Sequence, residues 1–341
     1  MSGLRWWRAP FWFLALFSGA KSFVDNPILG SRRLNRAGLH GVRLRAAHAL
    51  ARRRRSRIAR FVPAGLRDQF ERDGFIVIEN FLPEQEFRRL VEPVLSANLE
   101  ARIQQQGDTV TRRVPVGPEL RREVPALDAL LRSDRWRALM AYVATNWSEP
   151  LYYIQTVFGG AVDAPPDPQM ELHCDTFHPS LKAWLFLNDV NDDGRPLVYV
   201  RGSHRLTQER LNWERRKSVE VLDSGDRLSQ RGSLRVRLDE LGALGLPQPT
   251  AFTVPANTLV LADTCGFHAR AGSSKPSVRA ELWAFCRQNP FVPWTSAGLL
   301  SRAPLASRRA GALLRLFDWL DRRGIAKQHW KPAGPHKPIE P

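Results

Sequence analysis

The chain has 341 residues, of which 43% are hydrophobic and 25% are charged. A chain of this length and composition can bury a substantial core, which excludes an intrinsically disordered protein. Its three cysteines, Cys174, Cys265 and Cys286, form no CxxC pair. Their spacing excludes a disulfide framework and a cysteine-built zinc module, and it suits a reducing compartment.

Positive charge is concentrated at the N-terminus. The formal net charge is +17, and residues 1–60 contribute +13 of it, with 14 Lys or Arg against the single acid Asp25. The remaining 281 residues carry 37 basic and 33 acidic side chains. The sequence therefore predicts a basic, aromatic N-terminal arm over residues 1–60 that is separable from a nearly neutral folded body.

An apolar aromatic run at residues 9–20 follows two arginines and two tryptophans at positions 5–8. As a helix the run is about 18 Å long, well short of the ~30 Å hydrocarbon core, so we do not expect it to span a membrane. The tryptophans and the later arginines favour an arm on an anionic membrane surface, at its cytoplasmic face. The alternatives are a signal peptide cleaved after Ala20, a nucleic-acid-binding arm and a basic extension without a binding role. The nearly neutral body argues against nucleic acid.

From residue 61 to residue 295 the pattern is that of one folded domain. A β-branched run predicts a strand at residues 75–78. Apolar residues at helical spacing predict four helices, at residues 66–72, 83–95, 126–143 and 206–217. Residues 100–125 are polar and show no clear periodicity.

Beyond Pro150 the pattern is strand after strand, separated by Gly, Pro and Asp turns. Eight strands are expected, at residues 151–158, 170–173, 181–190, 197–201, 251–254, 258–262, 267–271 and 278–287. This succession predicts a mainly β protein with flanking helices, built on a sandwich or jelly-roll barrel. Residues 218–250 form an insertion, and residues 296–341 form a basic amphipathic helix and a proline-rich tail outside the domain.

His173 and Asp175 lie at the end of one predicted strand, and because side chains alternate along a strand, both project from the same face. His268 lies in another predicted strand. Two imidazoles and one carboxylate are the set that holds non-heme Fe(II) on one face and leaves coordination positions open. Each residue alone has an ordinary structural explanation, so the prediction of a metal site depends on the three together.

Arg279 lies 11 residues after His268, inside an apolar predicted strand. A guanidinium in such a strand needs a carboxylate partner, because an unpaired buried charge is costly. A bound dicarboxylate cosubstrate would supply one in bidentate geometry. Glu281, two positions further on the same face, is the rival partner in an internal salt bridge.

Several motifs occur in a fixed order along the chain: a lead-in at residues 70–82, the HxD motif at residues 173–175, and segments at residues 181–190, 192–194 and 202–204. The spacing from His268 to Arg279 continues this order. Together the motifs resemble the phytanoyl-CoA dioxygenase family over about residues 65–290.

The resemblance implies a double-stranded β-helix core (jelly-roll or cupin-like) that uses Fe(II), 2-oxoglutarate and O2. It implies that His173, Asp175 and His268 hold the metal. Arg279 would bind the distal carboxylate of 2-oxoglutarate, and no catalytic residue beyond the metal ligands is implied. The expected reaction is hydroxylation of a small or lipid-linked substrate with release of succinate and CO2. The Asp175 carboxylate favours hydroxylation over halogenation, because related halogenases replace that ligand with a small residue.

The sequence departs from the family pattern just after His268, the distal histidine of the proposed ligand set. Arg270 stands two positions after it, where a small hydroxyl residue often follows, and Ser273 or Ser274 are the candidates to replace that residue. The alternative function is a catalytically silent membrane-surface adaptor on the same scaffold. That alternative predicts no tight binding of Fe(II) or 2-oxoglutarate.

Overall fold

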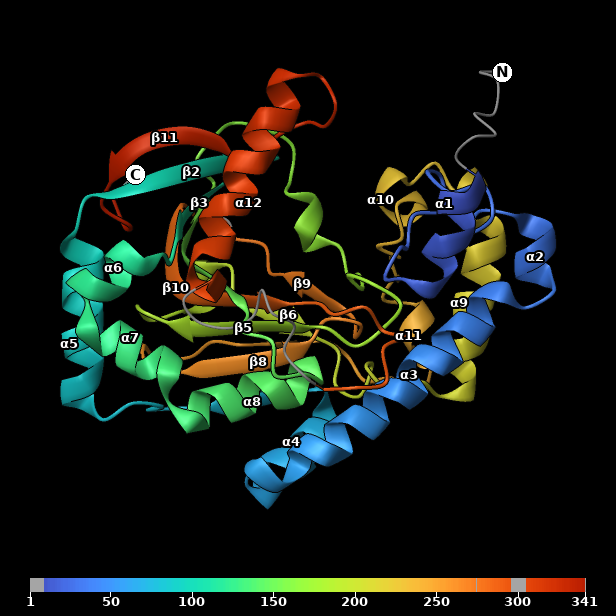
Figure 1. Cartoon of the computed structure of the whole chain (residues 1–341), viewed down its shortest axis with the longest axis horizontal. Coiled ribbons are helices and arrows are strands. Elements are labelled where there is room, and N and C mark those ends of the chain that lie inside the picture. The colour runs from blue at the N-terminus through green and yellow to red at the C-terminus, as the bar shows by residue number, and fades with distance from the viewer. Residues whose placement is uncertain (1–8, 274, 296–304, 341) are drawn as a thin grey trace.

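The computed structural model describes residues 9–273, 275–295 and 305–340, and its centre is a pair of antiparallel sheets (Figure 1). The larger sheet has eight strands in the order β1-β8-β5-β10-β4-β3-β2-β11, and the smaller has three in the order β7-β6-β9. The strands of the larger sheet are β1 (Phe75–Ile78), β2 (Leu99–Gln106), β3 (Thr109–Pro115), β4 (Leu151–Gly159), β5 (Leu181–Phe186), β8 (Leu259–Asp263), β10 (Ser277–Cys286) and β11 (Lys331–His336). Those of the smaller sheet are β6 (Leu197–Tyr199), β7 (Thr250–Ala251) and β9 (His268–Arg270).

Helices surround the two sheets (Figure 1). The described helices are α1 (Ala9–Leu14), α2 (Arg32–Arg36), α3 (Leu39–Ile58), α4 (Ala64–Asp73), α5 (Glu84–Ser96), α6 (Pro118–Glu123), α7 (Pro125–Arg132), α8 (Asp134–Ala144), α9 (Gln208–Glu220), α10 (Arg227–Gln230), α11 (Glu240–Ala243) and α12 (Leu305–Arg322). This arrangement confirms the predicted mainly β, jelly-roll class with flanking helices.

Alternation along β10 separates a hydrophobic core from a polar cavity. Ala280, Leu282 and Ala284 pack into the main buried cluster, which includes residues of α4, α5, α7 and α8. The alternating positions include Arg279 and Trp283, which line the cavity on the opposite face of the sheet. This period of two is the side-chain geometry of a strand.

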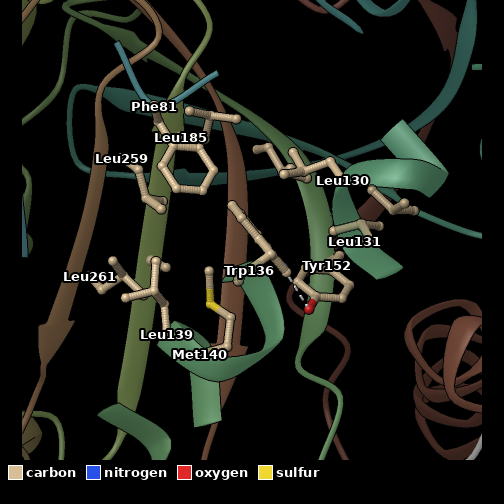
Figure 2. Packing of buried hydrophobic residues seen from close by; sticks show 14 of the residues in the cluster. Phe81, Leu130, Leu131, Trp136, Leu139, Met140, Tyr152, Leu185, Leu259 and Leu261 are labelled. Atoms are coloured by element: carbon tan, nitrogen blue, oxygen red, sulfur yellow. Dashed lines mark hydrogen bonds between the residues drawn. The ribbon is translucent and has the colours of Figure 1, made fainter. Parts of the chain in front are cut away.

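The main core is formed where α8 packs on the sheet. Figure 2 shows Trp136 and Met140 of α8 beside Leu185 of β5 and Leu261 of β8. The buried indole of Trp136 donates its N–H to the hydroxyl of Tyr152 at 3.0 Å. Burial of each large apolar side chain contributes about 1.5–3 kcal/mol, so this layer fixes the sheet on its helix-covered face.

The predicted helix at residues 126–143 is divided into α7 and α8. Ser133 lies between them in an extended conformation, and its hydroxyl accepts a hydrogen bond from the backbone N–H of Trp136 at 3.3 Å. This is the N-cap arrangement that favours the start of a new helix.

Three strands lie where none is expected from the sequence. β2 and β3 lie in the stretch at residues 100–125 that shows no periodicity. The sequence does not predict them because their cavity face carries polar side chains such as Gln104 and Arg113, so apolar and polar residues do not alternate along them. β11 pairs with β2 at the sheet edge, where Pro332 and Pro335 are tolerated. The C-terminal segment is therefore part of the larger sheet.

The described part of the N-terminal arm is packed on the body. Helix α3 contacts α8 and α9, and three of its arginines, Arg43, Arg54 and Arg55, are buried. Arg43 donates to three backbone carbonyls within residues 16–20, at 2.9–3.0 Å. Residues 9–60 are therefore packed against the body, whereas the charge distribution alone predicts a separable arm. The tryptophans at positions 6 and 7 lie outside the described residues, and no helix within the described ranges is both long and apolar enough to cross a membrane.

Arg54 joins α3 to two other segments, and its removal should destabilise the fold. Its guanidinium donates to the Thr145 hydroxyl at 3.1 Å, to the Pro290 carbonyl at 3.0 Å and to the Val292 carbonyl at 2.5 Å. Alanine at this position would leave these groups without their donor. We expect Arg54→Ala to lower the free energy of unfolding by about 2–4 kcal/mol, measured by urea unfolding.

The matched control is Arg53→Ala, which removes an equal charge from an exposed position on the same helix. It should change the free energy of unfolding by less than about 0.5 kcal/mol. Equal effects of the two substitutions would contradict a structural role for the buried guanidinium.

Candidate metal centre

One antiparallel bridge brings the three predicted ligands together. The N–H of His173 donates to the carbonyl of His268 at 3.0 Å, and the N–H of His268 donates to the carbonyl of His173 at 2.9 Å. His268 begins β9, whereas the strand expected at residues 170–173 is reduced to this bridge. The ligand atoms of the two histidines and Asp175 all lie within 4.8 Å of one another.

Backbone carbonyls orient both imidazole rings. The Nδ1 atom of His173 lies 2.7 Å from the carbonyl oxygen of Glu171, and that of His268 lies 3.0 Å from the carbonyl oxygen of Gly266. These bonds place the ring proton on Nδ1 and leave Nε2 for a metal. The Nε2 atoms lie 3.9 and 3.7 Å from Asp175 Oδ1, and the buried Nε2 of His268 has no hydrogen-bond partner among the described residues. This donor set fits a divalent metal ion.

The protonation states of the histidines suit metal binding. Burial lowers the pKa of His268 to about 4, and burial together with the neighbouring imidazole lowers the pKa of His173 well below its ordinary value. Both rings are therefore neutral at pH 7, which is the form that binds a metal.

Two lysines hold Asp175. The Nζ atom of Lys182, on β5, lies 2.7 Å from Asp175 Oδ2, and Lys21 donates to the backbone carbonyl of Asp175. Burial alone would raise the pKa of Asp175, but the ion pair with Lys182 and the two nearby imidazoles outweigh burial and hold that pKa below its usual range. Lys21 belongs to the predicted arm, so the N-terminal segment reaches the metal centre.

The three ligands open into a cavity of about 320 Å³. Its cationic, amide and indole groups are Arg113, Lys182, Arg270, Arg279, Gln104, Gln106, Gln155, Gln169, Trp184, Trp283 and Trp330. A larger hollow of about 800 Å³ lies along α6, α7 and α8 and contains none of the three ligands. The smaller cavity is therefore the candidate active site.

Arg279 lines this cavity and already contacts Glu281, the alternative partner expected from the sequence. Its Nε donates to Glu281 at 2.8 Å, and its Nη1 donates to the carbonyl of Arg195. The buried Glu281 also accepts a hydrogen bond from the Gln155 amide at 2.5 Å. No described residue hydrogen-bonds Nη2 of Arg279, so its two N–H groups can bind a carboxylate ligand.

A second guanidinium stands where the family pattern has a hydroxyl residue. Arg270 lines the cavity and forms an ion pair with the buried Asp167. The hydroxyl of Ser273 donates to the Lys275 carbonyl at 2.9 Å in an exposed turn. The other candidate, Ser274, lies outside the described residues.

Several cavity residues have little or no signal in the sequence. Gln104 and Gln106 are spaced as a strand places side chains on one face, which is the only local sign of their position. Arg113 lies in the same aperiodic stretch. Trp330 follows α12 in the expected tail, and only the pairing of β11 with β2 brings it to the cavity.

Comparison with known proteins extends these observations. The sequence profile of the phytanoyl-CoA dioxygenase family (PhyH) matches residues 70–221. The match includes His173 and Asp175 and ends before His268 and Arg279. No curated protein matches this sequence significantly.

The solved structures that match this chain include three with TM-scores below 0.5. The α-ketoglutarate-dependent epimerase SnoN from nogalamycin biosynthesis has 17% identity and a TM-score of 0.42, covering 67% of this chain and 82% of its own. HygX from Streptomyces hygroscopicus, with nickel and 2-oxoglutarate bound, has 18% identity and a TM-score of 0.42, covering 66% and 86%. The carbocyclase SnoK, also from nogalamycin biosynthesis, has 18% identity and a TM-score of 0.40, covering 66% and 83%.

Loss of His268 should weaken metal binding strongly. We expect His268→Ala to lower the affinity for Fe(II) by at least about 100-fold, which is more than the loss of a group that only hydrogen-bonds a ligand costs. Anaerobic titration calorimetry measures this affinity. His329→Ala, at an exposed position, is the control and should bind Fe(II) like the parent. Unchanged affinity in His268→Ala would remove this residue from the metal site.

Proposed function

Because residues 70–221 carry the phytanoyl-CoA dioxygenase domain, we propose that this protein is a non-heme Fe(II)- and 2-oxoglutarate-dependent dioxygenase. The observation that most supports the proposal is the meeting of His173, Asp175 and His268 at a cavity that also contains Arg279. Two imidazoles and one carboxylate form the ligand set of such oxygenases.

The residues of the site have separate roles in this proposal. His173, Asp175 and His268 hold Fe(II), and the carbonyls of Glu171 and Gly266 fix the two rings in the ligating orientation. When bound, Fe(II) with 2-oxoglutarate and O2 supplies oxidation of a substrate C–H bond, with release of succinate and CO2. The retained carboxylate of Asp175 favours hydroxylation.

We assign the distal carboxylate of 2-oxoglutarate to Arg279. Glu281 and the Arg195 carbonyl hold two nitrogens of the guanidinium, so its plane is fixed before a ligand arrives. A charge-assisted bond from the remaining nitrogen is of the strong class. In this interpretation the Glu281 contact orients Arg279 and does not compete with the cosubstrate.

The reaction itself is tested by uncoupled turnover. We expect the purified full-length protein to convert 2-oxoglutarate slowly to succinate without added substrate, and only when both Fe(II) and O2 are present. Succinate is measured by mass spectrometry. His173→Ala should reduce the rate to that of the metal-free control, since it removes a ligand. No succinate above that control under several reducing conditions would favour a catalytically silent adaptor.

Arg279→Ala separates cosubstrate binding from metal binding in the same preparation. It should raise the Kd for 2-oxoglutarate at least about tenfold while leaving the Kd for Fe(II) within about twofold, and Arg279→Lys should not restore the affinity fully. If Arg279→Ala binds 2-oxoglutarate normally, Arg279 has no role in cosubstrate binding and serves only in the salt bridge with Glu281.

We also propose that the protein lies on an anionic membrane surface at the cytoplasmic face. Four apolar side chains of the N-terminal segment are at least half exposed: Phe11, Phe13, Leu14 and Phe17. A second exposed apolar row on α12 comprises Leu313, Leu316 and Phe317. The exposed arginines at positions 52 and 53 add attraction to anionic headgroups.

Vesicle sedimentation tests this location. The full-length protein should bind phosphatidylcholine vesicles that contain phosphatidylglycerol more strongly than pure phosphatidylcholine vesicles. Phe17→Asp should weaken binding about tenfold, because burial of a phenylalanine contributes about 1.5–3 kcal/mol. Gln208→Asp places the same charge at another exposed position and should have little effect. Equal binding by the two variants would remove the N-terminal segment from the membrane contact.

A further inference from the structure

Arg113 is a cavity residue with no role in the chemistry described above. It lies on β3, with its guanidinium carbon 4.0 Å from the ring centre of Trp283 and 4.3 Å from that of Trp330. Its Nε donates to the Gln155 side-chain oxygen at 2.6 Å. Two indole rings and one amide therefore fix the plane of this cation at the cavity wall.

The charges around the cavity are paired with one exception. Lys182 lies 2.7 Å from Asp175, Arg270 pairs with Asp167, and Arg279 lies 2.8 Å from Glu281. In the described ranges of the chain, no carboxylate lies within ion-pair distance of Arg113. Burial lowers the pKa of this guanidinium to about 10, so it is still charged at pH 7. Glu281 reaches this guanidinium only through the Gln155 amide, and a partly buried cation with no directly paired carboxylate favours an anionic ligand.

The surrounding groups indicate what else the ligand carries. Besides the cations, the wall offers the amides of Gln104, Gln106 and Gln169 and the hydroxyl of Thr111, all of which donate and accept hydrogen bonds. Its aliphatic lining is limited to Leu197 and Ala269. Such a wall, in which amides, cations and indoles outnumber aliphatic groups, suits hydroxyl groups on a compact ring better than an alkyl chain.

The C-terminal segment completes this wall. Arg102 of β2 donates to Asp318 of α12 at 2.7 Å and to the carbonyl of Trp330 at 3.0 Å. These bonds hold Trp330 beside Arg113, with its ring centre 4.3 Å from the guanidinium carbon. The wall around Arg113 is thus built from the sheet and completed by a segment outside the family match.

We propose that Arg113 anchors the substrate and that the substrate is a small, hydroxylated molecule bearing a carboxylate or phosphate group. This inference rests on the proposed function, because it takes the anion bound by Arg113 to be the substrate that the dioxygenase oxidises. It differs from a fatty-acyl substrate, which the amide-rich wall suits less well. The same chemistry occurs in free sugar phosphates and in lipid headgroups.

Calorimetry tests the proposal without relying on turnover. The full-length protein is loaded anaerobically with Fe(II) and 2-oxoglutarate and titrated with glucose 6-phosphate, glucose and decanoate. We expect glucose 6-phosphate to bind at least tenfold more tightly than either of the others. Arg113→Gln should lose this preference, Arg113→Lys should keep part of it, and Arg122→Gln, at an exposed position, should keep all of it.

The outcomes separate this proposal from its alternatives. The Kd for 2-oxoglutarate should be unchanged in Arg113→Gln, and a rise would assign Arg113 to the cosubstrate instead. Equal binding of glucose and glucose 6-phosphate, tighter binding of decanoate, or no binding of glucose 6-phosphate would overturn the proposed ligand class. Trp330→Ala keeps the charge and should still weaken binding, which covers a misfolded Arg113→Gln. Arg113-dependent binding of phosphatidylinositol vesicles would place the same anion on a lipid headgroup.

Failure of the proposed function has a different signature. If the protein forms no succinate but binds glucose 6-phosphate through Arg113, the anion site stands and the oxygenase assignment falls. If it forms succinate but shows no Arg113-dependent preference, the oxygenase assignment stands and the anion site falls.

Discussion

The paired backbone hydrogen bonds between His173 and His268 are the constraint on which the rest of the site depends. They join the segment before β5 to the first residue of β9, and so fix two imidazoles from different parts of the chain at a ring separation of 4.5 Å. The β5 register then determines where Lys182 meets Asp175. A strand shifted by one residue would turn every one of these side chains to the other face.

A single buried carboxylate organises the opposite wall of the cavity. Glu281 binds Arg279 directly and reaches Arg113 through the amide of Gln155. Each guanidinium of this network is held by hydrogen bonds to its neighbours, so its plane is set by the protein before any ligand is present. Preorganised donors of this kind bind an anion without losing side-chain freedom at that moment.

The strands and motifs that could be predicted from the sequence are those with a continuous apolar pattern or a short local motif. β8 is an apolar run, β10 is apolar apart from Arg279 and Glu281, and the HxD motif is recognisable within three residues. β2 and β3 could not be found in this way, because one face of each carries polar cavity groups. The net charge of residues 1–60 likewise does not distinguish the exposed Arg53 from the buried Arg54, since both contribute one positive charge to a sum. Only the packing of α3 separates them.

The contacts that complete the cavity have a consequence for the order in which the protein folds. Lys21 and Asp175 are 154 positions apart, and Arg102 and Trp330 are 228 positions apart. Contacts of such sequence separation close large loops and form slowly, after local structure has appeared. Small zinc modules gather their ligands from neighbouring residues, and the metal drives their folding. In this chain His173 and His268 are 95 positions apart and are joined only by strand pairing, so the ligand set assembles after that part of the sheet has formed and iron would be captured by a structure already in place.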